Sequence, residues 1–312
     1  MDPINKPLRQ FANDRLGERM EKMRADILQD RRVQAFIEDN EEWAQENLEA
    51  GLNELYQYKT QWHNCDHCPG LFECPNLVRG YQPKLEVVRN SLQVTYESCS
   101  LKRKDDERRR QASFIQSLYI PKEMTTVTFD DFYEESSRMD AYTTALEFCS
   151  SIAPGENGEG LYIHGSFGVG KTFLVGAIAN ELADQEVRTM LVYTPDFLRE
   201  LKSGISDGSY QAKLDMIKKA PVLILDDIGA ESMSQWVRDD ILGSLLQFRM
   251  MEKLPTVFTS NFNLEELEIH LSQTNRGGVE RVDQLKARRI MERIKYLNKE
   301  IEMKGNNKRQ TP

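Results

Sequence analysis

A phosphate-loop motif constrains this chain more than any other feature. Residues 165–172 read GSFGVGKT and match the pattern GxxxxGK[ST], directly after the apolar run LYIH at 161–164. A helix-forming stretch at 172–183 follows, with apolar residues at helical spacing. Strand, glycine-rich turn and helix form the setting in which this motif cradles phosphates. The sequence therefore predicts an α/β domain that binds a nucleotide.

Each position of the loop has a task that follows from its chemistry. Glycines let successive backbone N–H groups turn towards the phosphates, and the positive end of the following helix adds to the attraction. The Lys171 ammonium is expected to reach the β- and γ-phosphates, and the Thr172 hydroxyl to ligate Mg²⁺. A glycine-rich turn without function is the less favoured alternative. The predicted cofactor-binding residues of the loop are Gly165, Ser166, Phe167, Gly168, Val169, Gly170, Lys171 and Thr172.

Two acids end a second apolar strand, VLILD at 222–226. Ligands of a parallel sheet bind at the carboxyl ends of its strands, which favours a catalytic role over a turn or a helix cap. Asp226 is expected to hold Mg²⁺ through water, and Asp227 to orient or activate the attacking water. The strand at 256–260 precedes Asn261, whose amide can reach the γ-phosphate if this strand lies between the other two. A turn asparagine is the alternative.

Composition limits what the rest of the chain can be. The 312 residues correspond to two domains at roughly 150 residues each. The formal net charge of −9 argues against a bulk nucleic-acid coat protein, but it leaves room for a local basic groove. No apolar run of roughly 18 residues is present, and the N-terminus lacks the apolar region of a secretory signal. We therefore expect a cytoplasmic protein.

Four of the five cysteines lie in one segment that also contains three prolines. Their spacing, Cys-x2-Cys-x5-Cys-x24-Cys, offers four thiolates, and the first pair has the tight-turn spacing of a zinc knuckle. We predict structural Zn²⁺, because four protein ligands leave no open position for a substrate; unrelated thiols are the alternative. His63 and His67 are alternative ligands, and Cys149 is predicted to be a core thiol. The predicted zinc ligands are Cys65, Cys68, Cys74 and Cys99.

The chain changes character along its length. Residues 8–60 have helical spacing and many charges, and 85–96 alternate well enough to be strands. The charge run KRKDDERRR at 102–110 predicts a solvated helix or a linker. From 161 onwards strands and helices alternate, which predicts a mostly parallel sheet. The predicted parts are a helical, zinc-binding domain at 1–105, a linker at 106–130 and the nucleotide-binding domain at 131–312.

The three motifs GSFGVGKT, VLILDDIGA and TSN, in this order, resemble those of the AAA+ ATPases. LDDIGAE and YTPDFLRELK (193–202) resemble the branch that contains bacterial helicase loaders and insertion-sequence transposition helpers. With the preceding cysteine segment, the whole chain resembles the DnaI-type replicative-helicase loaders. The ATPase resemblance covers about residues 130 to 303. Some members carry a histidine where Gln82 stands, which leaves Cys74 to complete the zinc site here.

The resemblance implies a fold and partners. The AAA+ core is a five-stranded parallel sheet, in which the Asn261 strand lies between the phosphate-loop strand and the Asp226 strand. Only a short polar tail follows the expected last strand near 296–303, so we expect the helical lid to be reduced or absent. The implied cofactors are ATP and Mg²⁺. The implied partners are the hexameric replicative helicase, bound mainly through the N-terminal domain, single-stranded DNA, other initiation proteins and further copies on the helicase.

AAA+ proteins insert an arginine of one subunit into the nucleotide site of its neighbour. The segment 287–294 matches the family's stretch for this residue, and we select Arg289, with Arg293 in reserve. A guanidinium suits the task because it is permanently charged and can form two parallel hydrogen bonds. Arginines that only coat an amphipathic helix are the alternative. The predicted catalytic residues are Lys171, Asp227, Asn261 and Arg289.

Contact with DNA is the least specific prediction. Phe197, Arg199 and Lys202 could stack on bases and contact phosphates, although the spacing of Phe197 is more typical of a core residue. The segment 286–309 is basic as well. We expect an ATP-dependent helicase loader that helps place the helicase on single-stranded DNA in initiation or restart of replication. The alternatives are an ATP-switched zinc-domain adaptor with little hydrolysis and a transposition-helper ATPase.

Overall fold

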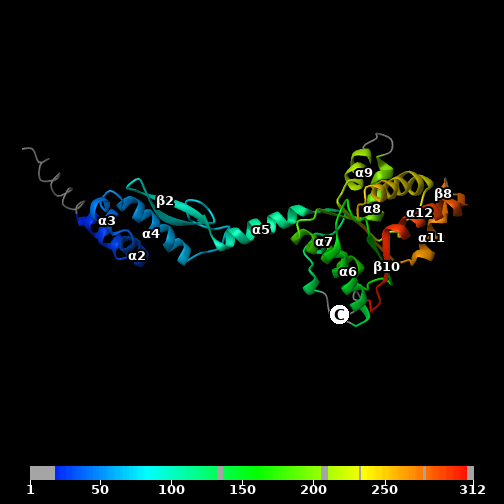
Figure 1. The fold of residues 1–312 in the computed structure, drawn as a ribbon, viewed down its shortest axis with the longest axis horizontal. Helices are drawn as coiled ribbons and strands as arrows, with labels where there is room; N and C mark the ends of the chain where they lie inside the picture. Colours follow the sequence, from blue (N-terminus) through cyan, green and yellow to red (C-terminus); the bar gives the residue numbers. More distant parts are fainter. Residues whose placement is uncertain (1–17, 132–135, 205–209, 232, 277–278, 308–312) are drawn as a thin grey trace, which may run out of the picture. The chain divides into compact units, whose positions relative to one another are not determined.

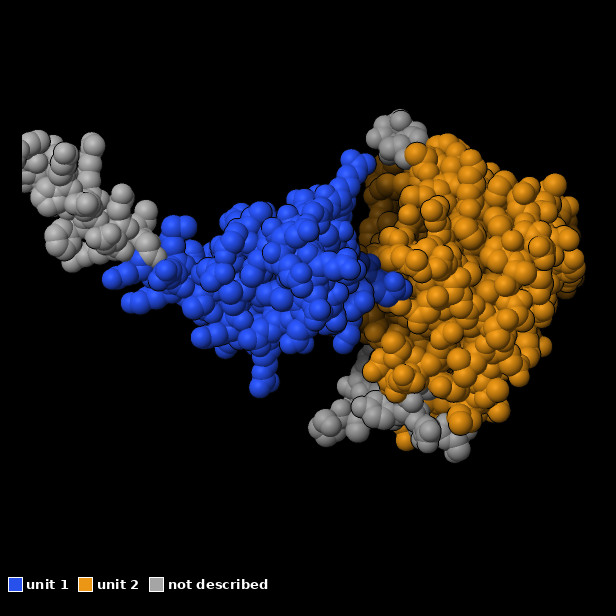
Figure 2. Space-filling model, turned by 60° about the vertical axis from the view of Figure 1, so that its left-hand side comes forward, with its two compact units in different colours: residues 1–108 blue, residues 109–312 orange. Residues whose placement is uncertain are grey.

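The computed structural model divides into two compact units, Met1–Arg108 and Arg109–Pro312 (Figure 2). The described residues are 18–131, 136–204, 210–231, 233–276 and 279–307. Within these ranges, no helix combines the length and the apolar character that a membrane crossing requires.

The first unit packs short helices against a β-hairpin. Residues 18–28 are helical, and the hairpin turns at Arg89 and Asn90, which both have positive φ, as tight two-residue hairpin turns require. The remaining elements are α2 (Arg31–Asp39), α3 (Glu41–Asn47), α4 (Leu52–Asp66), β1 (Tyr81–Val88) and β2 (Ser91–Ser98). Their shared core consists of Ile27, Val33, Trp43, Leu55, Leu85 and Leu92. The predicted helices are present from residue 18 onwards, while residues 8–17 of that prediction lie outside the described part of the chain, and the predicted strands within 85–96 are present as well.

The charge run forms a solvated helix. Helix α5 (Ser100–Phe114) contains no buried residue, as expected for a sequence without an apolar stripe. The chain then enters strand β3 (Ile115–Leu118), which pairs in parallel with a strand of the second unit. The segment 106–130, interpreted as a linker from its sequence, therefore contributes to the sheet. Ile115 and Leu118 explain why, since each packs against a hydrophobic cluster of the second unit.

The second unit is built on a parallel sheet of six strands in the order β10-β4-β7-β6-β5-β3. The prediction of five strands is corrected by β3, which adds an edge strand beside β5. The predicted position of the Asn261 strand is confirmed, because β7 lies between β4 and β6. The other strands are β4 (Gly160–His164), β5 (Thr189–Tyr193), β6 (Val222–Asp226), β7 (Thr256–Ser260) and β10 (Asn298–Glu302).

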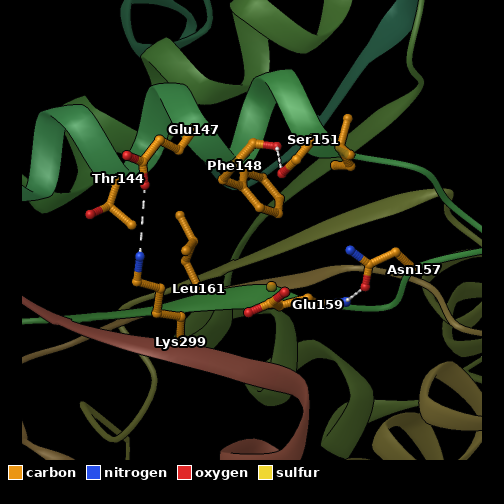
Figure 3. Close-up of a pocket in the computed structure, with 10 residues that line it drawn as sticks. Thr144, Glu147, Phe148, Ser151, Asn157, Glu159, Leu161 and Lys299 are labelled. Atoms are coloured by element: carbon orange, nitrogen blue, oxygen red, sulfur yellow. Dashed lines mark hydrogen bonds and ion pairs between the residues drawn. The ribbon is translucent and has the colours of Figure 1, made fainter.

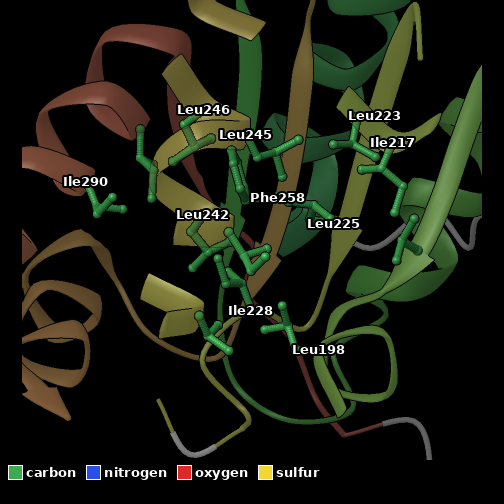
Figure 4. Close-up of a cluster of buried hydrophobic side chains, with 14 of the residues drawn as sticks. Leu198, Ile217, Leu223, Leu225, Ile228, Leu242, Leu245, Leu246, Phe258 and Ile290 are labelled. Carbon is green, nitrogen blue, oxygen red and sulfur yellow. The ribbon is translucent and has the colours of Figure 1, made fainter. Parts of the chain in front are cut away.

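Helices cover both faces of this sheet (Figure 1). Alternate residues of β6 point to opposite faces: Val222 and Ile224 join one hydrophobic cluster, and Leu223 and Leu225 the other. One cluster contains α6 (Met139–Ser151) and α7 (Lys171–Asp184). The other, drawn in Figure 4, contains α8 (Thr194–Ser203), α9 (Tyr210–Lys218), the π-helical η4 (Val237–Leu242), α10 (Gly243–Met251), α11 (Leu264–Ser272) and α12 (Gln284–Leu297).

Small elements complete the second unit. Strands β8 (Gln273–Arg276) and β9 (Val279–Val282) form an antiparallel hairpin between α11 and α12. Three 3₁₀ turns precede α6, namely η1 (Lys122–Thr125), η2 (Phe129–Asp131) and η3 (Ser136–Arg138). After β10, the described chain continues for residues 303–307 without a further helix. A lid bundle is therefore absent from the described part of the chain.

Candidate nucleotide site

The phosphate loop connects β4 to α7 with the backbone geometry that its glycines allow. Gly168 and Gly170 have φ of 75° and 102°, a region that residues with a side chain rarely adopt. Gly170 is the N-cap of α7, so the helix begins at Lys171. The Lys171 ammonium donates hydrogen bonds to the carbonyl oxygens of Gly165 (2.8 Å) and Ser166 (2.9 Å). These contacts hold the charged group at the loop, where a phosphate would bind.

Thr172 and Asp226 form the second part of the site. The Thr172 hydroxyl donates to both carboxylate oxygens of Asp226, at 2.9 and 3.2 Å, and Thr259 Oγ1 donates to the same carboxylate at 2.5 Å. Asp226 is only 2% exposed, and burial raises the pKa of its carboxyl, while the hydrogen bonds from Thr259 and Thr172 oppose this shift. A hydroxyl next to a carboxylate is a donor set that Mg²⁺ accepts, so these residues fit the predicted ion.

Asn261 connects two of the predicted catalytic side chains. Its Oδ1 accepts a hydrogen bond from Lys171 (2.8 Å), and its Nδ2 donates to Asp227 Oδ1 (2.8 Å). Asp227 has φ of 61°, and its backbone N–H donates to Thr259 Oγ1 at 2.8 Å. The order β4-β7-β6 explains this meeting, because the carboxyl ends of parallel neighbours lie at one edge of the sheet. The structure thus brings Lys171, Asp227 and Asn261 together.

Two residues near this edge were not singled out from the sequence. Thr259, on the middle strand β7, contacts both Asp226 and Asp227. Its position in the TSN motif is the sequence feature that could have identified it. Glu231 follows four residues after Asp227, and both of its carboxylate oxygens are buried without a side-chain hydrogen-bond partner in the described part of the chain. Burial raises the pKa of Glu231 to about 7, and repulsion from Asp227 contributes. Sequence alone gave no sign of this burial.

Helix α12 distinguishes between the two candidate arginines. Arg293 Nη1 donates to the Gly243 carbonyl oxygen at 2.7 Å, which holds its side chain against the beginning of α10. Arg289 is exposed, and no hydrogen bond or ion pair engages it within the described residues, whereas neighbouring Arg288 pairs with Glu268 (3.4 Å). Because α12 and α7 cover opposite faces of the sheet, the structure does not bring Arg289 to its own phosphate loop. The role of Arg289 in a neighbouring subunit stays a prediction.

The four cysteines of the first unit have polar surroundings. The sulfurs of Cys65, Cys74 and Cys99 accept hydrogen bonds from Asn76 Nδ2 (3.2 Å), Gly80 N (3.4 Å) and Lys102 N (3.4 Å). Burial raises the pKa of Cys65, the hydrogen bond from Asn76 opposes this shift, and repulsion from Cys74, Cys68 and Cys99 in their thiolate form raises the pKa further. Over the described ranges, however, no group of three or more His, Cys, Asp or Glu side chains has metal-binding geometry.

The remaining predicted residues have structural surroundings. Cys149 is a core thiol as predicted, since it is 1% exposed and burial raises its pKa to about 12. Phe197 is 1% exposed in the core, which removes it as a stacking platform, and Arg199 pairs with Asp196 (2.6 Å). Gln82 lies opposite Glu97 in the hairpin.

A small cavity of about 130 Å³ lies at the opposite end of β4 from the phosphate loop (Figure 3). It is bounded by α6, the beginning of β4 and Lys299 of β10, and Lys299 Nζ stands 3.8 Å from Glu147 Oε2 across it. None of the predicted site residues lines this cavity. It is therefore separate from the nucleotide site.

Comparison with known proteins agrees with this two-part architecture. The family described as "Primosomal protein DnaI N-terminus" matches residues 1–96, and "IstB-like ATP binding protein" matches residues 91–311. The replicative helicase loader DnaI of Bacillus subtilis (strain 168) is 43% identical over 312 residues, which cover 99% of each chain. The chain belongs to the DnaI family.

Solved structures agree with the DnaI assignment. A crystal structure of DnaI superposes with a TM-score of 0.55 at 47% identity, and it covers 64% of this chain and 98% of that one. A primosome component from Streptococcus pyogenes serotype M3 superposes with a TM-score of 0.52 at 36% identity, covering 64% and 97%. The second unit is accordingly an AAA+-type P-loop core. In the sequence it follows the region that matches the DnaI N-terminus.

Proposed function

We propose that this chain is an ATP-dependent loader of the replicative DNA helicase. The observation that carries the proposal is the full-length similarity to the helicase loader of Bacillus subtilis, which includes both units. The match to insertion-sequence ATPases covers residues 91–311 only, whereas the DnaI N-terminal region matches 1–96. A transposition helper would leave this first unit without an explanation.

In the proposed nucleotide complex, each residue of the site has a separate role. Lys171 leaves its carbonyl partners to contact the β- and γ-phosphates, and loop N–H groups hold the remaining oxygens. Thr172 and Asp226 would hold Mg²⁺, which neutralises phosphate charge when bound. Asp227 accepts the proton of the attacking water, and Asn261 keeps it aligned with Lys171.

The same proposal assigns the cysteines to a structural Zn²⁺ site in the first unit. Support comes from the electrostatic coupling of Cys65 to the other thiols and from the N–H groups that donate to three of the sulfurs, since such contacts stabilise thiolate ligands. Zn²⁺ would supply folding free energy on the order of 10 kcal/mol to a segment with few large apolar residues. We further infer that this unit binds the helicase.

A zinc measurement on the full-length chain tests the metal assignment. We expect one Zn²⁺ per chain by mass spectrometry of the purified protein, and loss of the metal in Cys65→Ser and Cys68→Ser. Cys149→Ser is the matched control, because this thiol lies in the core of the other unit. A wild-type chain that folds and binds the helicase without zinc would refute the assignment.

A loading assay tests the function. Purified helicase rings are offered to circular single-stranded DNA with and without the chain and ATP, and the DNA-bound helicase is counted. We expect loading to require both the chain and ATP. Helicase binding without ATP-dependent loading would contradict the proposal. ATP turnover, measured with helicase and DNA present, distinguishes a true ATPase from an ATP-switched adaptor.

A further inference from the structure

The first unit carries a groove with a strongly acidic lining. The groove has a volume of about 640 Å³ and is formed by the end of α2, by α3 and by the hairpin at Val87 and Asn90. Residues 33–58 include seven acids and no Lys or Arg, so nearby basic residues in the sequence do not offset this charge. The acids that line the groove, hereafter the acidic groove, are Glu38, Asp39, Glu41, Glu42 and Glu46.

The folded unit does not use these carboxylates. All five side chains are exposed, and within the described ranges none of them forms an ion pair or a side-chain hydrogen bond. Other acids of the same unit are paired, as in Arg24–Glu49 and Arg32–Asp66. The charge of the acidic groove is therefore available to a partner.

Two of the acids also oppose the helix that carries them. Glu38 and Asp39 occupy the last turn of α2, which contains no basic residue. The carboxyl end of a helix is its negative end and repels anions, so these two charges lower the stability of α2. Helix stability thus gives no reason for their position, whereas contact with a cation outside the unit does.

Trp43 indicates which kind of cationic ligand fits. It lines the acidic groove, is 5% exposed, and its indole Nε1 is buried without a hydrogen-bond acceptor in the described part of the chain. A buried donor without an acceptor costs free energy, which favours a ligand that brings both cations and acceptors. A basic peptide segment brings both, through its side chains and its backbone carbonyl groups, whereas a metal ion offers no acceptor and a nucleic acid is repelled.

We propose that the acidic groove docks a lysine- or arginine-rich segment of the helicase. This inference rests on the proposed function, which assigns helicase binding to the first unit. Opposite charges across an interface accelerate association and fix the register of the partners, and salt screens them. The acidic groove thus supplies the electrostatic part of helicase recognition.

Neutralising the acids at the end of α2 separates binding from folding. In full-length Glu38→Gln/Asp39→Asn, the melting temperature should stay the same or rise, because an unfavourable charge is removed from the helix end. The affinity for the immobilised helicase ring, measured by biolayer interferometry in about 50 mM NaCl, should fall roughly tenfold. In about 300 mM NaCl the wild-type and variant affinities should differ by less than about twofold.

Two further variants complete the test. Glu46→Gln, in the last turn of α3, should lower the affinity and keep the melting temperature for the same reasons. Glu18→Gln/Glu21→Gln is the matched control, because it removes two charges from the helix at 18–28 and neither residue lines the acidic groove. The control should keep the wild-type affinity within about twofold.

Unchanged affinity in both groove variants would overturn the inference. An equal loss in the control would overturn it as well, because only the net charge of the unit would then matter. A loss that persists undiminished at high salt would show that the acids do not act through their charge, which also contradicts the proposal. A wild-type chain that does not bind the helicase would refute the proposed function itself.

Discussion

A single carboxamide connects the charges of the nucleotide site. Asn261 accepts from Lys171 with its oxygen and donates to Asp227 with its nitrogen, so the orientation of the amide is determined by both partners. Thr259, two residues earlier on the same strand, holds the backbone N–H of Asp227 and the carboxylate of Asp226. The middle strand thereby sets the relative positions of groups that come from its two neighbours.

Asp227→Asn tests the role of the base. The asparagine keeps the shape of the side chain but cannot accept a proton, so ATP should still bind with Mg²⁺ while turnover falls by roughly a hundredfold. Nucleotide binding is measured by calorimetry and turnover by phosphate release in the presence of helicase. Unchanged turnover would exclude a catalytic role for Asp227.

Glu231 gives the fold a pH dependence of defined sign. Its pKa rises from 4.5 to about 7 in the folded chain, so between these values the folded state holds a proton that the unfolded state has lost. Stability therefore falls as the pH rises through this window, by up to about 3 kcal/mol. Glu231→Gln cannot ionise, and it should raise the melting temperature more at pH 8 than at pH 5. An equal effect at both pH values would contradict the assignment.

At the scale of the elements, one buried arginine joins α10 to its neighbours. Arg249 is fully buried, and burial lowers its pKa to about 9. Its guanidinium donates to four carbonyl oxygens and one hydroxyl, those of Ile217, Lys218, Ala220, Pro255 and Thr256. These acceptors lie at the end of α9 and at the beginning of β7, so the contacts join α10 to both elements.

Arg249→Met should destabilise the second unit by about 3 kcal/mol, because methionine fills the space but leaves buried carbonyl groups without donors. Chemical denaturation followed by circular dichroism measures the loss. Arg199→Met is the control: its side chain is 77% exposed and, among the described residues, pairs only with Asp196 of the same helix, so the change should cost less than about 0.5 kcal/mol. Equal stability of the two variants would show that the Arg249 contacts contribute little.

Elements with a strong sequence period were predictable, and short ones were not. The strand at 222–226 reads as a continuous apolar run because it is buried on both faces. Strand β3 has the sequence IQSL, and it follows a helix without a buried residue. Four residues with two polar ones in the middle carry too little periodicity to indicate a strand. The strand is recognised only in the structure, where it pairs with β5. It is the sixth strand of a sheet for which five were expected.

At the scale of the whole molecule, the active assembly is expected to share its sites between subunits. Arg289→Ala should leave ATP binding by the isolated chain intact, because the residue serves a neighbour, and should abolish helicase-stimulated turnover. Arg288→Ala is the control from the same helix. Mixing Arg289→Ala with Lys171→Ala should restore part of the activity, since some interfaces then contain both residues. No restoration in confirmed mixed assemblies would count against a shared site.

The candidate site was predictable where the chemistry lies in a local motif. Lys171, Thr172 and the two aspartates follow from short patterns, and the order of the strands follows from the resemblance. Contacts between segments that are distant in the sequence were not predictable: Arg138 Nη2 donates to the carbonyl oxygen of Asn306, 168 residues further along the chain. The burial of Glu231 was equally inaccessible, because it depends on how the loop after β6 packs, and a sequence pattern does not encode this.

The alternation of the sheet side chains has a consequence for how this sequence can vary. Ile224 and Leu225 are adjacent in the chain, yet Ile224 packs in the cluster of Leu174 and Leu225 in the cluster of Leu198. Substitutions on opposite faces share no partners, so their free-energy effects should add. Among homologous sequences, a change of side-chain volume at Leu225 should be compensated around α8, and one at Ile224 around α7. Ile224 and Leu225 would thus be substituted independently of each other among homologues, although they are adjacent in the chain. Each would instead vary together with residues of its own hydrophobic cluster that lie far away in the sequence.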